Sequence, residues 1–111
     1  MAQIIGYLTK AEKERFKKYA KGLDLDASAL ANLLIRRELE IRRLVLLYSK
    51  YHSEEGSADR EKITGHQSSN ATKRAFEKYV AGLGFRPTPS AAVLFRAELS
   101  ERWLQKTIQK P

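Results

Sequence analysis

The residues of this chain that could do chemistry are its cations. Of 111 residues, 21 are lysine or arginine and 13 are aspartate or glutamate, which gives a formal net charge of +8. Residues 1–50 carry 11 basic and 6 acidic side chains, residues 51–68 carry 2 and 4, and residues 69–111 carry 8 and 3. Two basic blocks around an acidic connector favour a polyanion such as nucleic acid as the partner. The alternative at this point is a soluble, lysine-rich helical surface with no such partner.

Catalysis and metal binding are not expected from this sequence. The chain has no cysteine and two histidines, and neither His52 nor His66 has a carboxylate at metal-ligand spacing. No Gly-rich phosphate loop, serine elbow or Ser/His/Asp set is visible. We therefore predict no enzyme activity, no metal and no cofactor. No apolar run approaches the roughly 20 residues of a membrane span and no signal peptide opens the chain, so we expect a cytoplasmic protein that does not bind membranes.

The chain repeats itself at an offset of sixty residues. Residues 9–44 align with residues 69–104 without a gap, with 14 identical pairs among 36 positions. Each half alone, at roughly fifty residues, is marginal as a separate core, so we expect the halves to share one. One chain would then do what two subunits usually do. The expected division is a first repeat (1–51), an acidic linker (52–61) and a second repeat (62–111), both repeats forming one compact domain.

The first repeat has the pattern of a strand followed by two helices. Residues 3–8 are short, β-branched and aromatic, which favours a strand. Thr9 with Glu12 makes a capping box that starts the first helix. Asp26 can cap a second helix, which we expect to run to about Tyr48 or Tyr51.

The second repeat follows the same order with weaker signals. Residues 62–68 take the strand position, although they contain one strong β-former. Ser69 or Asn70 can cap the first helix. Thr88, followed by a proline at the first helical position, starts the last helix, which runs to about Gln109. The predicted order is therefore β-α-α-linker-β-α-α.

This order and its local motifs resemble the ribbon-helix-helix (MetJ/Arc/CopG-type) family of DNA-binding proteins. The segments that carry the resemblance are Tyr7–Glu12, Phe16, Ala20, Leu23–Asp26 and Leu33–Arg37. The resemblance covers residues 2–44 well and 62–104 less well. It implies a mainly α fold, a tandem ribbon-helix-helix with one two-stranded antiparallel ribbon and four helices. In that family the paired strands enter the major groove, and here residues 3–8 and 63–68 would pair within one chain as a pseudo-dimer.

Strand alternation selects the base-reading residues that this resemblance implies. In the first strand, Ile4 and Leu8 are the natural core positions, with Gly6 between them. A glutamine amide can pair bidentately with adenine, an isoleucine can contact a thymine methyl, and a tyrosine can reach a phosphate or a base. The outward residues of the first strand are Gln3, Ile5 and Tyr7.

Two facings of the second strand remain open. The sixty-residue offset points Ile63 and Gln67 outward, and Thr64 and His66 inward. A slip of one residue buries Ile63 and exposes Thr64 and His66 instead. The candidate base readers of the second strand are therefore Thr64, His66 and Gln67.

Helix starts and flanking cations are the expected phosphate contacts. The free N–H groups and positive dipole end of a helix suit a phosphate, and small residues there permit close approach. Pro87 and Pro89 remove two N–H donors, so the second repeat is expected to hold a phosphate less well than the first. The expected phosphate contacts are Lys10, Lys13, Ala27, Ser28, Arg60, Lys62, Lys73, Arg86, Thr88 and Ser90.

The second helix of the first repeat also carries four arginines. We expect them on a solvated helix face, paired with Glu38 and Glu40 at helical spacing. Because Arg36–Glu38 returns as Arg96–Glu98, this pair could form an ion pair at the pseudo-twofold axis. The four arginines are Arg36, Arg37, Arg42 and Arg43.

Taken with the resemblance, these patterns predict sequence-specific binding of double-stranded DNA. The expected setting is an accessory protein of plasmid transfer (the relaxosome) or a transcriptional repressor, with a relaxase or another DNA-processing protein as a further partner. The alternative is a protein–protein interaction module on the same fold, which the apolar outward residues Ile5 and Tyr7 favour. The chain would be a monomeric pseudo-dimer or, by exchange of strands, a homodimer.

Overall fold

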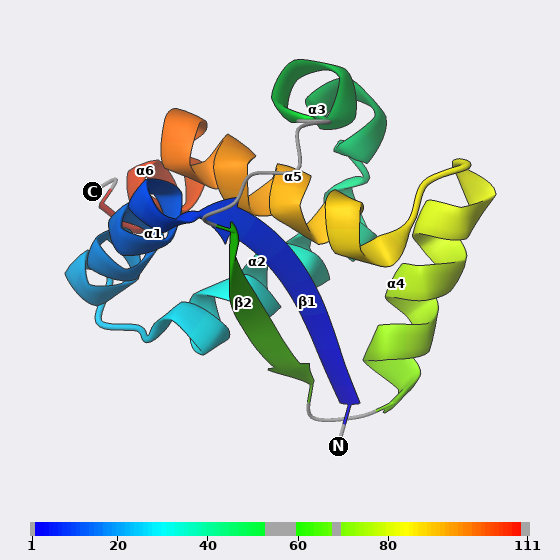
Figure 1. The fold of residues 1–111 in the computed structure, drawn as a ribbon, viewed down its shortest axis with the longest axis horizontal. Coiled ribbons are helices and arrows are strands. Elements are labelled where there is room, and N and C mark those ends of the chain that lie inside the picture. Colours follow the sequence, from blue (N-terminus) through cyan, green and yellow to red (C-terminus); the bar gives the residue numbers. More distant parts are fainter. Residues whose placement is uncertain (1, 53–59, 68–69, 110–111) are drawn as a thin grey trace.

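The computed structural model describes residues 2–52, 60–67 and 70–109 (Figure 1). Within these residues the fold is mainly helical, with one two-stranded antiparallel sheet. Residues 53–59 of the predicted linker (52–61), together with Ser68 and Ser69, lie outside the described part. The elements are β1 (Ala2–Thr9), α1 (Lys10–Gly22), α2 (Ala27–Ile41), α3 (Leu44–Tyr51), β2 (Arg60–Gln67), α4 (Asn70–Gly82), α5 (Pro87–Glu101) and α6 (Trp103–Gln109).

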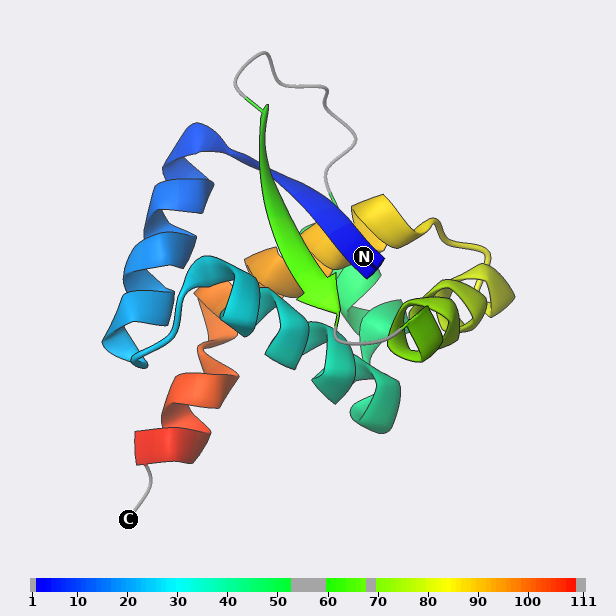
Figure 2. The ribbon, with the colours of Figure 1, turned by 90° about the horizontal axis from the view of Figure 1, so that it is seen from below.

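The two strands pair with each other into a ribbon, as the sequence predicts. Ala2 lies opposite Gln67 at one end and Thr9 lies opposite Arg60 at the other. The second strand begins at Arg60, two residues earlier than predicted. Helix α5 packs on β1 and helix α2 packs on β2, and Figure 2 shows both helices on the same side of the ribbon.

The core lies between the ribbon and the helices and draws on both halves of the chain. Ile4 and Leu8 from β1 join Ile63 from β2 in one cluster of buried side chains. The Phe16 and Phe95 rings, from α1 and α5, are 5.1 Å apart between centroids. Burial of aromatic side chains contributes most to a small core because each removes about 150–250 Å² from water.

The predicted starts of the first-half helices are confirmed. Thr9 and Glu12 form the capping box of α1, and the Asp26 side chain accepts a hydrogen bond from the Ala29 N–H at the start of α2. Between α1 and α2, Asp24 takes a left-handed backbone with φ of 62°. Its counterpart Gly84, with φ of 81°, does the same in the second half, where glycine carries no Cβ penalty.

The start predicted for the last long helix was wrong by two residues. Helix α5 begins at Pro87 with Arg86 at the N-cap, and not at Thr88. A proline suits the first helical position because its missing N–H would have no intrahelical acceptor there.

The prediction of one helix from Asp26 to about Tyr48 or Tyr51 was also wrong. Helix α2 ends at Ile41, and Arg42 takes a left-handed backbone with φ of 52°. The carboxylate of Glu38 then accepts a 2.6 Å hydrogen bond from the N–H of Leu44, the first residue of α3. A buried side chain thereby satisfies a donor that a continuous helix would have satisfied with a carbonyl.

The same break occurs sixty residues later. Arg102 has φ of 51°, and the carboxylate of Glu98 accepts a 2.7 Å hydrogen bond from the N–H of Leu104 in α6. The described residues therefore contain six helices where four were expected.

Candidate nucleic-acid interface

The outer face of the ribbon is where the predicted base readers gather. On β1 the predicted facing is confirmed, because Ile4, Gly6 and Leu8 are buried while Gln3 is exposed. On β2 the slipped alternative is correct, since Ile63 is 3% exposed and His66 is exposed. The facing obtained from the sixty-residue offset was wrong.

The facing differs because the two strands repeat at a different sequence offset from the helices. Ile4-x-Gly6 returns as Ile63-x-Gly65, an offset of 59, whereas the helices repeat at 60. Strand side chains alternate with a period of two, so one extra residue between β2 and α4 exchanges the faces.

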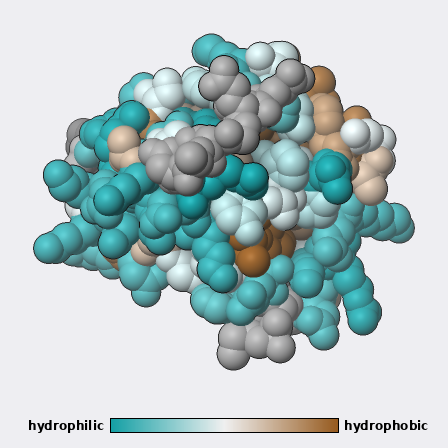
Figure 3. All heavy atoms as spheres, in the orientation of Figure 1, coloured by the Kyte–Doolittle hydropathy of each residue, from teal (hydrophilic) through white to brown (hydrophobic). Residues whose placement is uncertain are grey.

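The outer face consists of three cross-strand pairs. Gln3 lies opposite His66, Ile5 opposite Thr64, and Tyr7 opposite Lys62. Gln3, Lys62 and His66 are exposed, and the middle pair is half-buried. Figure 3 views this face, which is largely hydrophilic around a small hydrophobic spot. The side chain of Gln67 lies outside the described part, so its predicted base contact is untested.

A cation caps one end of this face. The Arg60 guanidinium lies 4.3 Å from the ring centroid of Tyr7, and Arg60 is exposed. Lys10, at the start of α1, follows directly after the strand at the same end and is also exposed. Lys73, near the start of α4, follows the opposite end of the ribbon and is half-exposed (Figure 1).

The inner face is sealed by close contact with α5. A Cβ built on Gly6 would lie 2.7 Å from Cε2 of Phe95 and 2.9 Å from the backbone nitrogen of Ala92. Glycine is therefore required here so that helix and strand can approach each other.

The free edge of β2 is bonded to α2. The backbone N–H of His66 donates to Oγ of Ser28 at 3.3 Å, and the side-chain amide of Asn32 donates to the His66 carbonyl. The hydroxyl of Ser28 therefore accepts a hydrogen bond from the ribbon, and its own O–H remains able to donate to a phosphate. Ala27, the other residue of this helix start that was predicted to contact phosphate, is half-exposed.

The two helix starts predicted to hold phosphate differ in charge. Asp26 places a carboxylate at the start of α2, whereas its counterpart at the start of α5 is the exposed Arg86. Thr88 is half-buried, and Ser90 is 0% exposed, which removes its side chain from the predicted contacts. The local charge thus opposes phosphate at the start of α2, where the sequence favoured it, and attracts phosphate at the start of α5.

Sequence reasoning missed two buried carboxylate clusters beneath the ribbon. Glu38 accepts a 2.5 Å hydrogen bond from the Tyr79 hydroxyl, and Glu98 accepts one of the same length from the Tyr19 hydroxyl. Burial and, next, the hydrogen bond to the facing carboxylate raise the pKa of each tyrosine far above its usual range. The return of both the tyrosine and the glutamate at an offset of sixty was the signal that could have predicted this contact.

These clusters overturn the predicted arginine pairing. Glu38 and Glu98 are each 1% exposed and thus do not lie on a solvated face. Arg96 pairs with Glu12 at 3.1 Å, and Arg37 pairs with Glu98 at 2.8 Å. An arginine and a glutamate two residues apart point to opposite sides of a helix, so an Arg36–Glu38 contact is not favoured.

Arg43 also forms an ion pair with a glutamate of the other half of the chain. Its guanidinium lies 3.1 Å from Glu101, which also accepts a hydrogen bond from the Tyr51 hydroxyl at 3.2 Å. Although partial burial opposes it, the hydrogen bond and charge of Arg43 lower the pKa of Glu101. This pair connects the end of α5 to the region of α3.

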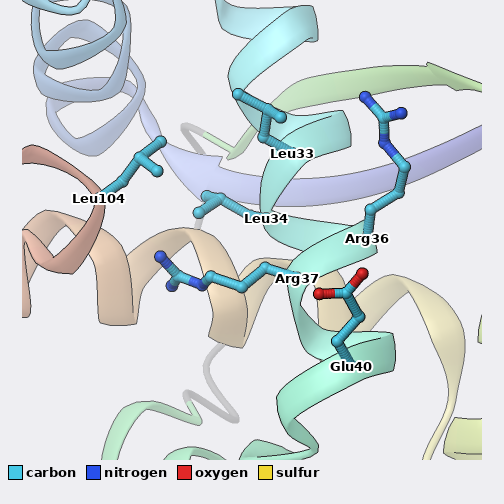
Figure 4. Close-up of a pocket in the computed structure, with 6 residues that line it drawn as sticks. All are labelled: Leu33, Leu34, Arg36, Arg37, Glu40 and Leu104. Carbon is cyan, nitrogen blue, oxygen red and sulfur yellow. The ribbon is translucent and has the colours of Figure 1, made fainter. Parts of the chain in front are cut away.

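A hollow of about 370 Å³ lies between α2 and α6 (Figure 4). Its walls include Leu33 and Leu34 from α2 and Leu104 from α6. Arg37 extends toward α6, whereas Arg36 points away from it. Since Arg37 is bonded to Glu98, its charge is already balanced within the fold.

A scan against protein-family models and searches of curated proteins and of solved structures find no match to this chain. Membership of the ribbon-helix-helix family therefore stays a prediction. Within the described ranges, no three histidine, aspartate or glutamate side chains are grouped as a metal site requires. No helix in those ranges is both long and apolar enough to cross a bilayer.

Proposed function

We propose that this chain is a tandem ribbon-helix-helix protein that binds double-stranded DNA and reads base sequence with the outer face of its ribbon. One observation carries the proposal: α2 and α5 cover the inner face of the ribbon, and the opposite face presents polar and cationic side chains. Gln3, Lys62 and His66 are the exposed members of that face.

A two-stranded ribbon has the dimensions for this task. The major groove is about 12 Å wide and admits such a ribbon, and its base edges carry a distinct donor and acceptor pattern for each base pair. The strands pair with each other along the ribbon, and Ser28 and Asn32 of α2 bond the outward backbone groups of His66, so the outer side chains are free to contact bases.

The positive charge near the ribbon supplies the phosphate contacts. Lys62 and Arg60 are exposed on β2, and Lys10 is exposed where α1 begins. These three side chains lie at the Tyr7 end of the ribbon and would hold the DNA backbone there, and Lys73 follows the opposite end, so that the register in which the outer face meets the bases is fixed. The biological setting, plasmid transfer or repression of transcription, follows from the family resemblance and is part of the proposal.

The competing function is a protein-interaction surface at the same place. Ile5 lies in the middle of the outer face and is half-buried rather than fully exposed. A small apolar centre with a polar rim is also typical of a site that binds protein.

Salt dependence separates the two functions. We expect fluorescence anisotropy with a labelled random-sequence duplex to give binding that weakens steeply as salt rises, with a log–log slope of about −0.9 for each phosphate neutralised. Lys62→Ala should make the slope shallower by about 0.9, the contribution of one phosphate contact. Lys106→Ala, which removes another exposed lysine, from α6, a helix that lies away from the ribbon in Figure 2, should leave the slope unchanged. Absence of binding, or a slope near zero, would favour the protein-interaction surface.

A further inference from the structure

The buried side of the ribbon has a local twofold symmetry that the exposed side lacks. Ile4 lies opposite Gly65, and Gly6 lies opposite Ile63. Exchange of the two strands about a point between Ile5 and Thr64 maps this buried quartet onto itself. This exchange matches each residue of β1 with the residue of β2 that is 59 positions later in the sequence.

The same operation exchanges unlike residues on the outer face. It maps Gln3 onto Lys62, and Tyr7 onto His66. One end of the ribbon therefore presents Gln3 beside His66, and the other end presents Tyr7 beside Lys62. In a symmetric dimer the two ends would be identical, and the DNA site would be a palindrome with matching half-sites.

The chemistry of the two ends differs as well. A glutamine amide pairs best with the N6 and N7 edge of adenine, whereas lysine and arginine pair best with O6 and N7 of guanine. At the Tyr7 end, Lys62 is exposed and the Arg60 guanidinium lies 4.3 Å from the Tyr7 ring, which adds a second cation.

The helix starts carry an independent asymmetry of charge. Asp26 stands at the N-cap of α2 and Arg86 at the N-cap of α5, and both are exposed. A phosphate near the start of α5 would meet a guanidinium, and a phosphate near the start of α2 would meet a carboxylate. The backbone contacts therefore also differ between the two sides of the bound site.

We propose that the chain binds a non-palindromic DNA site in one orientation, with the Gln3–His66 end over an adenine-containing half-site and the Tyr7–Lys62 end over a guanine-containing one. This inference rests on the proposed function. The residues that set the orientation are Gln3, Lys62, His66 and Tyr7.

Selection of duplexes from a random pool by the full chain gives the first test. The enriched site should lack twofold symmetry, and reversal of one half-site should weaken binding roughly tenfold for each base pair changed. A palindromic enriched site would overturn the inference while leaving DNA binding intact. If no duplex is enriched above the starting pool, the proposed function fails, and the inference fails with it.

Orientation can be measured directly because the chain contains no cysteine. Ala11→Cys and Ala71→Cys place one thiol on the exposed first turn of α1 or of α4, which follow opposite ends of the ribbon. With an iron-chelate DNA-cleaving label on each thiol, every protein should cut one side of the selected site, and the two labels should cut opposite sides. Equal cutting on both sides by either label would contradict a single orientation.

A symmetrised ribbon provides the matched control. Gln3→Lys together with His66→Tyr gives both ends the same pair of side chains, and both positions are exposed. This double variant should select a more symmetric site, and each label should then cut the second side more strongly than in the original chain, while the Asp26 and Arg86 difference at the helix starts remains. An unchanged, asymmetric site would show that these residues do not set the orientation.

Discussion

Glu38 and Glu98 stand at equivalent positions of the two halves, and each is buried against a tyrosine hydroxyl from the opposite half. They differ in charge balance, because Glu98 has the Arg37 guanidinium at 2.8 Å and the counterpart of Arg37 in the second half is Ala97. Burial raises the pKa of Glu38 above its ordinary value. Both halves thus have the hydrogen bonds that end their long helices, while a guanidinium bonded directly to the carboxylate is found at Glu98, and at Glu38 Arg43 acts through its charge without an ion pair.

The ribbon shows the same division between kept and changed features. Its buried positions repeat in kind, as Ile4 with Ile63 and Gly6 with Gly65, whereas its outward positions do not. Packing constrains the buried side chains of both halves equally. The outward side chains have no such constraint, so their difference is where the two halves can acquire separate tasks.

The largest expected effect distinguishes the two carboxylates. Glu98 uses Oε1 for Arg37 and Oε2 for Tyr19, so Glu98→Gln turns an amide N–H₂ toward one of these partners. We expect this variant to lose about 3 kcal/mol of unfolding free energy in urea, because it leaves a partly buried cation unpaired. Glu38→Gln should lose only about 1 kcal/mol, since the hydrogen bonds from Tyr79 and Leu44 reach the same oxygen of Glu38 and an amide oxygen can replace it. Equal losses would contradict the charge difference between the clusters.

The second prediction concerns the buried face of the ribbon. Gly6→Ala places a Cβ against Phe95 and the backbone of Ala92, so β1 and α5 must separate. We expect a loss of about 2 kcal/mol by thermal or urea unfolding, as for overpacked cores. Gly22→Ala is the matched control, because nothing lies within 4 Å of a Cβ there and alanine favours a helix by about 1 kcal/mol. If Gly6→Ala is as stable as the control, the close approach of β1 to α5 does not limit stability.

The sequence was sufficient for the features that depend on local chemistry. The capping box at Thr9 and Glu12, the left-handed position at Asp24 and the facing of β1 all follow from short-range rules, and the structure contains them. The facing of β2 could not be obtained from the helix repeat, because one extra residue shifts the strand phase without changing the helices.

The helix breaks illustrate the second limit of sequence reasoning. Arg42 is an ordinary helix former, and nothing within its own segment predicts a left-handed backbone there. The break depends on Glu38, which is buried because Tyr79 from the other half reaches it. A contact across 41 residues thus decides the local backbone, and tertiary packing overrides propensity.

A third prediction concerns Gln3, on the outer face of the ribbon. Gln3→Ala should reduce the preference for the selected site over random DNA by roughly tenfold, which is the lower part of the range for one bidentate base contact. Affinity for random DNA should stay nearly unchanged, because the substitution removes no charge. Anisotropy titrations with both duplexes at one salt concentration measure this. A parallel loss on both duplexes would mean that Gln3 does not read a base.

The smallest expected effect is the pH dependence that Glu38 contributes. Because burial raises the pKa of Glu38 in the folded state, the folded chain holds this proton to a higher pH than the unfolded chain does. The resulting stabilisation is complete below the unfolded pKa of about 4.5 and is lost as the pH rises through the folded pKa. Glu38→Gln has no such proton, so its unfolding free energy should improve relative to the original chain as the pH rises from 4 toward 7. Urea unfolding of both proteins at half-unit steps of pH measures the difference. If the difference is flat, or changes in the opposite direction, then folding does not raise the pKa of Glu38, and burial does not control the charge of this carboxylate.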